Sequence, residues 1–168
     1  IETRDTQQRE RFAFRSSLQR PREAAYELVL ATEQLINYEK WRVPEGNRLG
    51  WSATAVDAER WRFSKGNSAI AIGAINARTG WRLSFEQFDL QTVSDIIKLD
   101  GDYFGGVLNG EISLLNVPTQ PTFSAQLDID KLVTLGGTLG DLKIRAIDEG
   151  ARRIKLATRL RGMGSALR

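Results

Sequence analysis

The chain contains neither cysteine nor histidine. Without cysteine it has no disulfide, which suits the cytosol and a bacterial periplasm alike. The two absences together exclude nucleophilic sites of the Ser-His and Cys-His kinds, and they remove the usual zinc ligands. Histidine is also the commonest general base. We therefore expect no enzyme activity, no catalytic residues, no metal and no cofactor.

Long apolar runs are missing as well. No segment approaches the roughly 20 apolar residues of a transmembrane helix, and no charged segment followed by an apolar run marks a signal peptide. The chain begins with Ile1 instead of methionine and stops at Arg168, shortly after a strand-like run. We expect this chain to be a segment of a longer protein, so the missing transmembrane helix and signal peptide say nothing about the whole protein.

Alternation of apolar and polar residues is the strongest pattern present. In 142–146 and 153–161 every second residue is apolar, and most of the others are charged. Period two is typical of a β-strand with one dry face and one face in water. Similar short runs recur through the chain with turn signals between them, and no secure run has the 3.6-residue helical period. These features predict an all-β fold.

Several local predictions follow the chain from its start. Residues 1–10 are polar, and we expect them to be frayed. Alternation over 11–18 and 25–32, with Pro21 in the turn between them, predicts a β-hairpin. Helix competes for 22–40 because Glu, Ala and Leu are good helix formers, and 35–41 fits a helical turn.

The middle of the chain carries further signals. The near-continuous apolar run 69–75 predicts a strand buried on both faces, or one with small residues outside. A phase slip at Gln87 predicts a bulge. Residues 92–99 fit a strand or a short helix equally. Asn109-Gly110 is a hairpin signal, but its short flanks favour one long strand with a glycine kink.

The net charge of +3 is concentrated near the C-terminal end, where 141–168 contain eight Lys or Arg and three Asp or Glu. A basic face can meet nucleic acid or lipid headgroups, but more often it is a solvated sheet face. Fourteen aromatic residues also raise the possibility of base stacking on a barrel. Most of them are in phase with Leu and Ile, which indicates a dry face. We therefore expect no nucleic-acid partner.

Other candidate sites are weaker. Asp128 and Asp130 lie two residues apart, and Asp100 and Asp102 flank a glycine; such pairs can serve calcium or glycoside hydrolysis. Aspartate is also common in turns and on solvent faces, which is the plainer interpretation. The glycine-rich run 136–140 lacks the lysine of a phosphate loop and is better explained by bends and close strand approach.

A family resemblance connects several of these strands. The run 109–114 through 125–129, and the run 139–146 followed by 154–160, resemble the C-terminal region of the TamB family, the translocation and assembly module proteins of Gram-negative bacteria. Upstream, 35–47 is similar to a stretch of family members from the Bacteroidetes. The order and spacing of the strands carry the resemblance, which covers about residues 26–162.

The resemblance implies a fold and a function. TamB-like proteins are anchored in the inner membrane by an N-terminal helix, cross the periplasm, and are implicated in moving phospholipids to the outer membrane. Their long β-sheets curl into a taco-shaped groove with a hydrophobic interior, and they partner with an outer-membrane barrel of the TamA/BamA type. The resemblance therefore implies that 11–168 form a single curled segment of a periplasmic protein that binds phospholipid or another acyl-chain ligand.

The residues that we expect to line the groove share one phase within each run. They are Phe12, Phe14, Leu28, Leu30, Trp51, Trp61, Phe63, Ile70, Ile72, Trp81, Leu83, Phe85, Phe123, Leu127, Leu142, Ile144, Ile154 and Leu156. Glycines at 105, 106, 136 and 137 would let the sheet curl.

The alternative is a closed β-sandwich, a structural or adhesive module whose core is sealed. Burying a leucine or phenylalanine is worth roughly 1.5–3 kcal/mol whichever apolar partner covers it, so periodicity does not separate the two. Pattern alone favours the sealed core. An excised groove would also have open sheet edges, so we expect edge-strand self-association.

Overall fold

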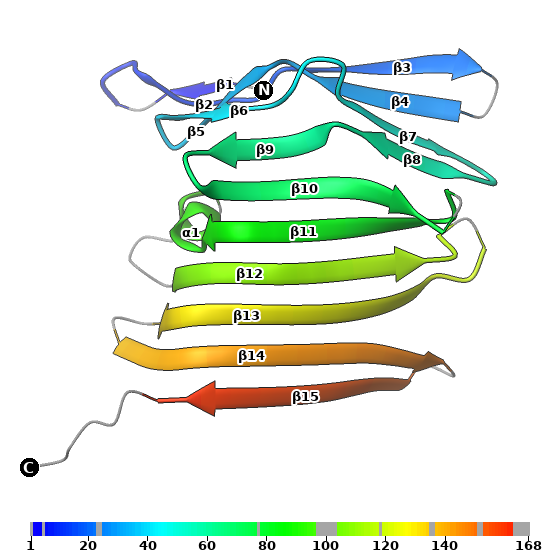
Figure 1. Cartoon of the computed structure of the whole chain (residues 1–168). Helices are drawn as coiled ribbons and strands as arrows, with labels where there is room; N and C mark the ends of the chain where they lie inside the picture. Colours follow the sequence, from blue (N-terminus) through cyan, green and yellow to red (C-terminus); the bar gives the residue numbers. More distant parts are fainter. Residues whose placement is uncertain are drawn as a thin grey trace, which may run out of the picture.

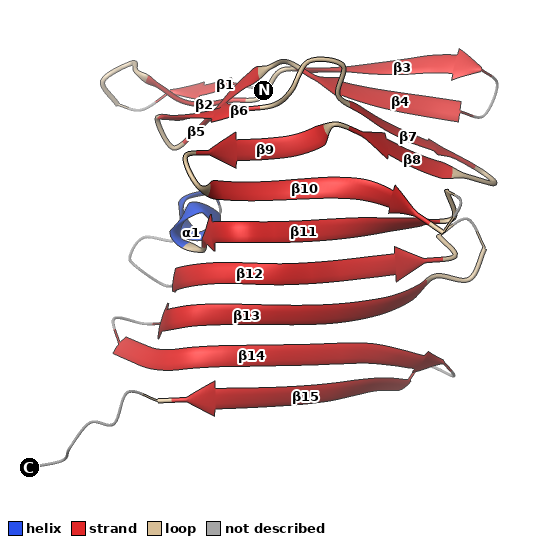
Figure 2. Ribbon diagram, viewed as in Figure 1, coloured by secondary structure: helices blue, strands red, loops and turns tan. Residues whose placement is uncertain are grey.

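The computed structural model describes residues 2–4, 6–22, 25–76, 78–96, 104–117, 119–134, 137–150 and 153–162. Within these ranges the chain forms fifteen strands and one short helix (Figures 1 and 2), which confirms the all-β prediction. The same ranges hold no helix long and apolar enough to cross a membrane. The elements are β1 (Glu2–Arg4), β2 (Glu10–Ala13), β3 (Ser16–Arg22), β4 (Ala25–Leu30), β5 (Glu33–Ile36), β6 (Glu39–Arg42), β7 (Arg48–Ser52), β8 (Val56–Glu59), β9 (Trp61–Lys65), β10 (Ser68–Ile75), β11 (Gly80–Asp89), α1 (Gln91–Ile96), β12 (Phe104–Leu115), β13 (Thr122–Thr134), β14 (Gly137–Gly150) and β15 (Arg153–Arg161).

The strands build two antiparallel sheets. The larger sheet is open and curled and has eleven strands in the order β1-β2-β5-β6-β9-β10-β11-β12-β13-β14-β15. Its last seven strands follow one another in sequence as a meander, visible in Figure 1 as a ladder that ends at β15. The smaller sheet, β3-β4-β7-β8, is made where the chain leaves the large sheet twice, after β2 and after β6.

Two buried side-chain amides support these crossings between the sheets. Gln34 accepts a hydrogen bond from the Arg15 backbone N–H (2.9 Å) and donates to the Arg15 carbonyl (3.0 Å). Asn47 accepts from the Leu30 N–H and donates to the Leu30 carbonyl, both at 2.8 Å. Each side-chain amide pairs with the backbone N–H and C=O of one residue, as a neighbouring strand would, at a point where the backbone leaves its sheet. This pairing is needed because buried N–H and C=O groups require hydrogen-bond partners.

Several N-terminal predictions need correction. Residues 2–4 are not frayed, because they form β1 against β2. The predicted hairpin exists, but it starts at Ser16, and 10–13 belong to the other sheet. The helical turn at 35–41 is wrong. Asn37 (φ 49°) and Tyr38 (φ 66°) instead make the two-residue turn between β5 and β6. Two successive positive φ angles are typical of the type I′ hairpin turn.

The middle of the chain agrees better with its sequence pattern. The bulge at Gln87 is confirmed by a register shift between Phe85 and Phe88. Residues 109–110 lie inside the single long strand β12, as predicted. Of the ambiguous segment 92–99, residues 92–96 belong to α1, and 97–99 fall outside the described residues. Gly106 (φ 124°) occupies a second register shift in β12, and Gly136 also falls outside the described residues.

One apolar core joins the curled N-terminal strands to the middle of the large sheet. The central residue is Trp41, which is 1% exposed and packs against Phe88 with ring centroids 6.1 Å apart. The buried members of the core are Phe12, Leu30, Ile36, Trp41, Val43, Phe63, Phe88, Leu108, Ile129 and Leu132.

Candidate functional site

The most extensive candidate surface is one face of the large sheet, called here the apolar face. Strand register aligns its side chains in rows that cross the strands, because paired residues project to the same side. One row runs from β9 to β15 as Trp61, Ile72, Leu83, Ile112, Ala125, Ala146 and Leu156. The next row reads Phe63, Ile70, Phe85, Gly110, Leu127, Ile144 and Thr158.

Two further rows flank this pair. At the α1 end, Phe88, Leu108, Ile129, Leu142 and Leu160 follow one another from β11 to β15. At the opposite end, Ala74, Trp81, Leu114 and Phe123 are paired in the same way from β10 to β13. The four rows together give the apolar face a width of several side chains along the strands.

The opposite face of the sheet is polar and charged. Arg62 on β9 and Glu86 on β11 form a two-fold hydrogen-bonded ion pair at 2.8 and 2.6 Å, over the small residues of β10. Their mutual hydrogen bonding raises the pKa of Arg62 and lowers that of Glu86. The small residues Ala69 and Ala71 lie on this face, as one of the two predictions for 69–75 has it, but Ala69 is only 1% exposed, so β10 is largely buried on this side as well.

Coverage of the apolar face decreases from the N-terminal to the C-terminal strands. Near β2, β5 and β6 it is covered by the curl of the sheet and by the core. On β14, Leu142 and Ile144 are half-buried. On β15 every residue is exposed, with Leu156 at 63%. The large sheet is therefore not sealed into a sandwich at this end of the described chain.

A hollow of about 200 Å³ lies on the apolar face where the sheet curls. Its walls are aromatic and aliphatic except for Thr92, which comes from the start of α1. We call it the tryptophan hollow; its lining residues are Phe14, Ile36, Trp41, Trp61, Phe63, Ile70, Phe88 and Thr92.

Most of the predicted lining residues share this face or its core. Thirteen of them lie on the apolar side of β9–β15: Trp61, Phe63, Ile70, Ile72, Trp81, Leu83, Phe85, Phe123, Leu127, Leu142, Ile144, Ile154 and Leu156. Phe12 and Leu30 belong to the core, and Phe14 packs against it. Leu28 and Trp51 do not join them: both lie in the four-stranded sheet and, unlike Leu30 of the same sheet, neither is among the residues of the core, and Trp51 stacks on Tyr26 instead.

Sequence reasoning missed several residues of the same surface. Trp41 and Ile36 were obscured by the expected helical turn, although both lie in strands with period-two neighbours. Phe88 follows the bulge, and Leu108 and Ile112 flank the glycine of β12. The alternation within β12 was the signal that would have identified the last two.

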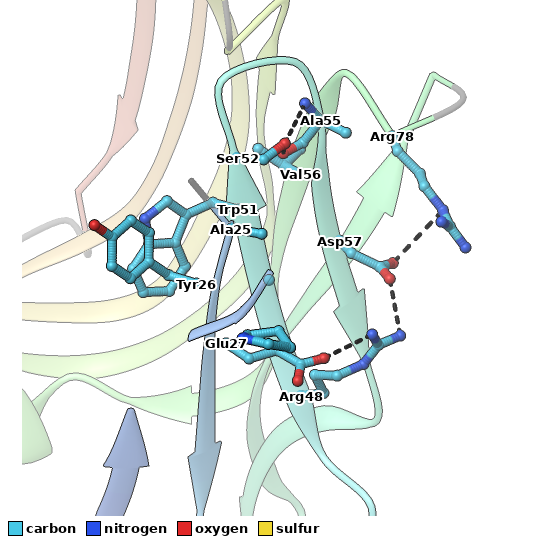
Figure 3. Close-up of a pocket in the computed structure, with 12 residues that line it drawn as sticks. Ala25, Tyr26, Glu27, Arg48, Trp51, Ser52, Ala55, Val56, Asp57 and Arg78 are labelled. Carbon is cyan, nitrogen blue, oxygen red and sulfur yellow. Dashed lines mark hydrogen bonds and ion pairs between the residues drawn. The ribbon is translucent and has the colours of Figure 1, made fainter. Parts of the chain in front are cut away.

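A second hollow, of about 260 Å³, lies on the polar side of the small sheet over Gly50 (Figure 3). Arg48 beside it contacts Glu27 at 2.8 Å, Asp57 at 2.9 Å and Glu59 at 3.3 Å. The hydrogen bond to Glu27 is the main reason that the pKa of Arg48 is raised. Every carboxylate here has the same guanidinium as a partner, so the network is explained by cross-strand pairing.

In the part of the chain that the structure describes, Asp128 and Asp130 show no sign of a joint site. Asp128 is paired with Lys143 at 3.2 Å, and Asp100 and Asp102 fall outside the described residues. Within the described ranges, no group of acidic residues is arranged to hold a metal ion. Comparison with protein-family models, curated proteins and solved structures finds no significant match to this chain.

Proposed function

We propose that this chain is a segment of a bridge-like lipid-transfer protein, and that its apolar face holds phospholipid acyl chains in a β-sheet groove. One observation carries the proposal: the row from Trp61 to Leu156 continues without a charged residue from the half-buried strands to the exposed β15. Exposed apolar patches of this kind on soluble proteins mark binding surfaces. The resemblance to TamB in strand order supports the same function.

The dimensions of the face suit an acyl chain. Neighbouring strands lie about 4.8 Å apart, so the six spacings from β9 to β15 cover about 29 Å. The hydrocarbon core of a bilayer is about 30 Å thick and holds two acyl chains end to end, so one chain needs about half that length. A single tail would thus lie across the strands within one row.

The mechanism would be passive. Each buried methylene contributes about 0.8 kcal/mol wherever it lies on an apolar surface, because the hydrophobic effect has no direction. A tail can therefore slide along a row without losing specific contacts, while its headgroup stays in water at the open side. A small shift of the tail along a row would therefore cost little free energy.

The cellular setting in this proposal comes from the family resemblance. The parent protein would be anchored in the inner membrane and cross the periplasm, and it would support outer-membrane assembly with a TamA/BamA-type barrel. The function of the segment described here would be to continue the apolar path between the two membranes.

Lipid retention tests the proposal directly. The chain would be purified without detergent, extracted with organic solvent, and its lipids quantified by mass spectrometry. The double variant Ile144→Glu, Leu156→Glu places two charges on the apolar face and should lose most of the lipid. The control Gln126→Glu, Ala157→Glu makes the same charge change on the polar face and should keep it.

Equal lipid in both variants, or none in the unaltered chain, would contradict the proposal. If the double variant fails to fold, Leu156→Glu alone is suitable, because this side chain is exposed. A structural β-module is the second candidate, favoured by the packing of Trp41 against Phe88 within the buried core. For that function no acyl ligand would be found under any condition.

A further inference from the structure

The last strand of the large sheet, β15, has an open outer side. It pairs with β14 along 153–161 and comes last in the sheet order, so no described strand lies beyond it (Figure 1). Alternate residues of a strand direct their backbone N–H and C=O groups to the same side. About half of the nine residues of β15 therefore point these groups away from β14, and such a row is a template for one more strand.

The side chains of β15 divide between the two faces of the sheet. On the apolar face, Ile154, Leu156 and Leu160 are 59%, 63% and 52% exposed. On the polar face, the strand presents four cations around one alanine: Arg153, Lys155, Ala157, Arg159 and Arg161. A strand that completes this edge must therefore bring apolar side chains on one face and groups that suit cations on the other.

The cations of β15 lack the compensation that charges have elsewhere on the polar face, where ion pairs join β9 to β11 and β11 to β12. Among the described residues, the one ion pair that reaches β14 or β15 joins Lys143 to Asp128, at 3.2 Å. Asp141 lies opposite Arg161 in the register, but its carboxylate accepts a hydrogen bond from the Lys131 backbone N–H at 3.1 Å. Within the described part of the chain, the four cations of β15 therefore have no carboxylate partner.

A second copy of this chain is a poor source of the missing strand. Two β15 strands paired with their apolar sides together would place only cations and alanine on the shared polar face, and like charges opposite one another are destabilising. The other edge of the large sheet, β1, spans only three residues. The edges of the small sheet fit no better, because β3 is itself basic and the carboxylates of β8 are already paired with Arg48. The charges therefore work against the self-association that an open edge alone would predict.

Charge complementarity points to an acidic strand. A carboxylate opposite a Lys or Arg on a neighbouring strand is a favourable cross-strand pair, and adding a strand to a sheet edge is a general mode of peptide recognition. A nucleic acid or an anionic membrane surface would also attract the four cations, but it would leave the outer backbone groups of β15 without strand partners. An extended polypeptide satisfies the backbone, the apolar side chains and the cations together.

We propose that the outer edge of β15 binds an extended segment of another polypeptide in which acidic and apolar residues alternate. The acidic side chains would lie beside Lys155 and Arg159 on the polar face, and the apolar ones would continue the rows that end at Leu156 and Leu160. The proposal does not depend on what the apolar face of the sheet binds.

Two fluorescein-labelled peptides of identical composition test this edge with the whole chain. One peptide alternates glutamate and valine, and the other carries the same residues as two separate blocks. Fluorescence anisotropy should show that the alternating peptide binds roughly tenfold more tightly, because only this peptide can place every carboxylate on one face of a strand. In the ¹⁵N-labelled chain it should slow hydrogen exchange at alternate amides of 153–161, those that face away from β14.

Charge reversal on β15 tests the role of its cations. The double variant Lys155→Glu, Arg159→Glu should weaken binding of the alternating peptide roughly tenfold, because two attractive cross-strand pairs become repulsive. The same variant should bind an alternating lysine–valine peptide instead. The control Arg42→Glu, Lys131→Glu makes the same charge change at exposed cations of β6 and β13 and should bind like the unaltered chain. If the reversed strand does not fold, Lys155→Gln, Arg159→Gln should still weaken binding, by a smaller factor.

Three outcomes would overturn the proposal. Equal binding of the alternating and block peptides would show attraction by charge alone. Binding of phosphatidylglycerol vesicles without binding of either peptide would assign the cations to a membrane surface. Protection of the same β15 amides without peptide, in a chain that sediments as a dimer, would assign the edge to a second copy.

Discussion

Replacing Gly110 by alanine tests how the long strand β12 is built into the apolar face. Gly110 has φ 131°, a conformation that side-chain-bearing residues rarely adopt. A Cβ atom there would also lie 2.1 Å from the Gln126 carbonyl oxygen and 2.9 Å from the Leu127 Cα of β13. Both neighbours are backbone atoms, so relief would require β12 and β13 to separate.

The magnitude follows from two costs. A strained backbone conformation of this kind costs about 1–3 kcal/mol, and forcing an extra carbon into a packed site costs about 1–3 kcal/mol. We therefore expect Gly110→Ala to lower the free energy of unfolding by about 2–6 kcal/mol. Urea denaturation followed by circular dichroism should show a midpoint lower by about 1–2 M, because the urea dependence for a domain this size is at the upper end of 1–3 kcal/mol per M.

Gly73→Ala is the matched control. Gly73 lies in β10 of the same sheet, and a Cβ there would meet no atom within 4 Å. Where the native backbone is not strained, Gly→Ala raises the free energy of unfolding by about 0.4–1 kcal/mol, because alanine lowers the conformational entropy of the unfolded chain. The reasoning is refuted if Gly110→Ala unfolds at the same urea concentration as the unaltered protein, or if the two variants lose stability equally.

Three further predictions concern stability. Glu86→Gln should reduce the pH dependence of unfolding. Because the hydrogen bond to Arg62 lowers the pKa of Glu86 in the folded protein, the ion pair stabilises the fold above pH 4.5, the ordinary pKa of a glutamate. This stabilisation is lost as the pH falls below that value. The pair is exposed, so the effect should be about 0.2–1 kcal/mol, and urea midpoints that fall equally with acid in both proteins would contradict this. Arg48→Gln leaves Glu27, Asp57 and Glu59 without their common cation and should cost about 1–3 kcal/mol in chemical denaturation, whereas Lys155→Gln on the exposed edge strand should cost nothing measurable. Trp41→Ala should cost about 3–5 kcal/mol by leaving a cavity, and Leu156→Ala less than about 0.5 kcal/mol because the side chain is exposed; similar thermal midpoints for these two variants would show that the core is misplaced.

The C-terminal half of the fold was predictable because its signals are local. Alternation in β14 and β15 reports one dry face, and the phase slip at Gln87 marks a bulge whatever the tertiary structure. At Asn109-Gly110, the shortness of the apolar runs on either side favours one long strand over a hairpin. All of these patterns are set within about ten residues.

The N-terminal half depends on distant contacts that a sequence pattern does not contain. Nothing around Arg15 shows that the chain changes sheets there, because the partner that permits it, Gln34, lies nineteen residues away. The turn at Tyr38 needs a positive φ, which tyrosine seldom adopts. Alternation likewise shows that Trp51 has a dry side, but not which sheet it joins.

The central claim is that the apolar face carries acyl chains, and photo-crosslinking tests it at residue level. The chain would be incubated with a photoactivatable fatty acid, irradiated, and its adducts located by peptide mass spectrometry. The proposed function predicts adducts on Leu127, Ile144 and Leu156, and none on their neighbours Gln126, Arg145 and Ala157, which project to the polar face. Adducts spread equally over the two sets, or absent from both, would contradict it.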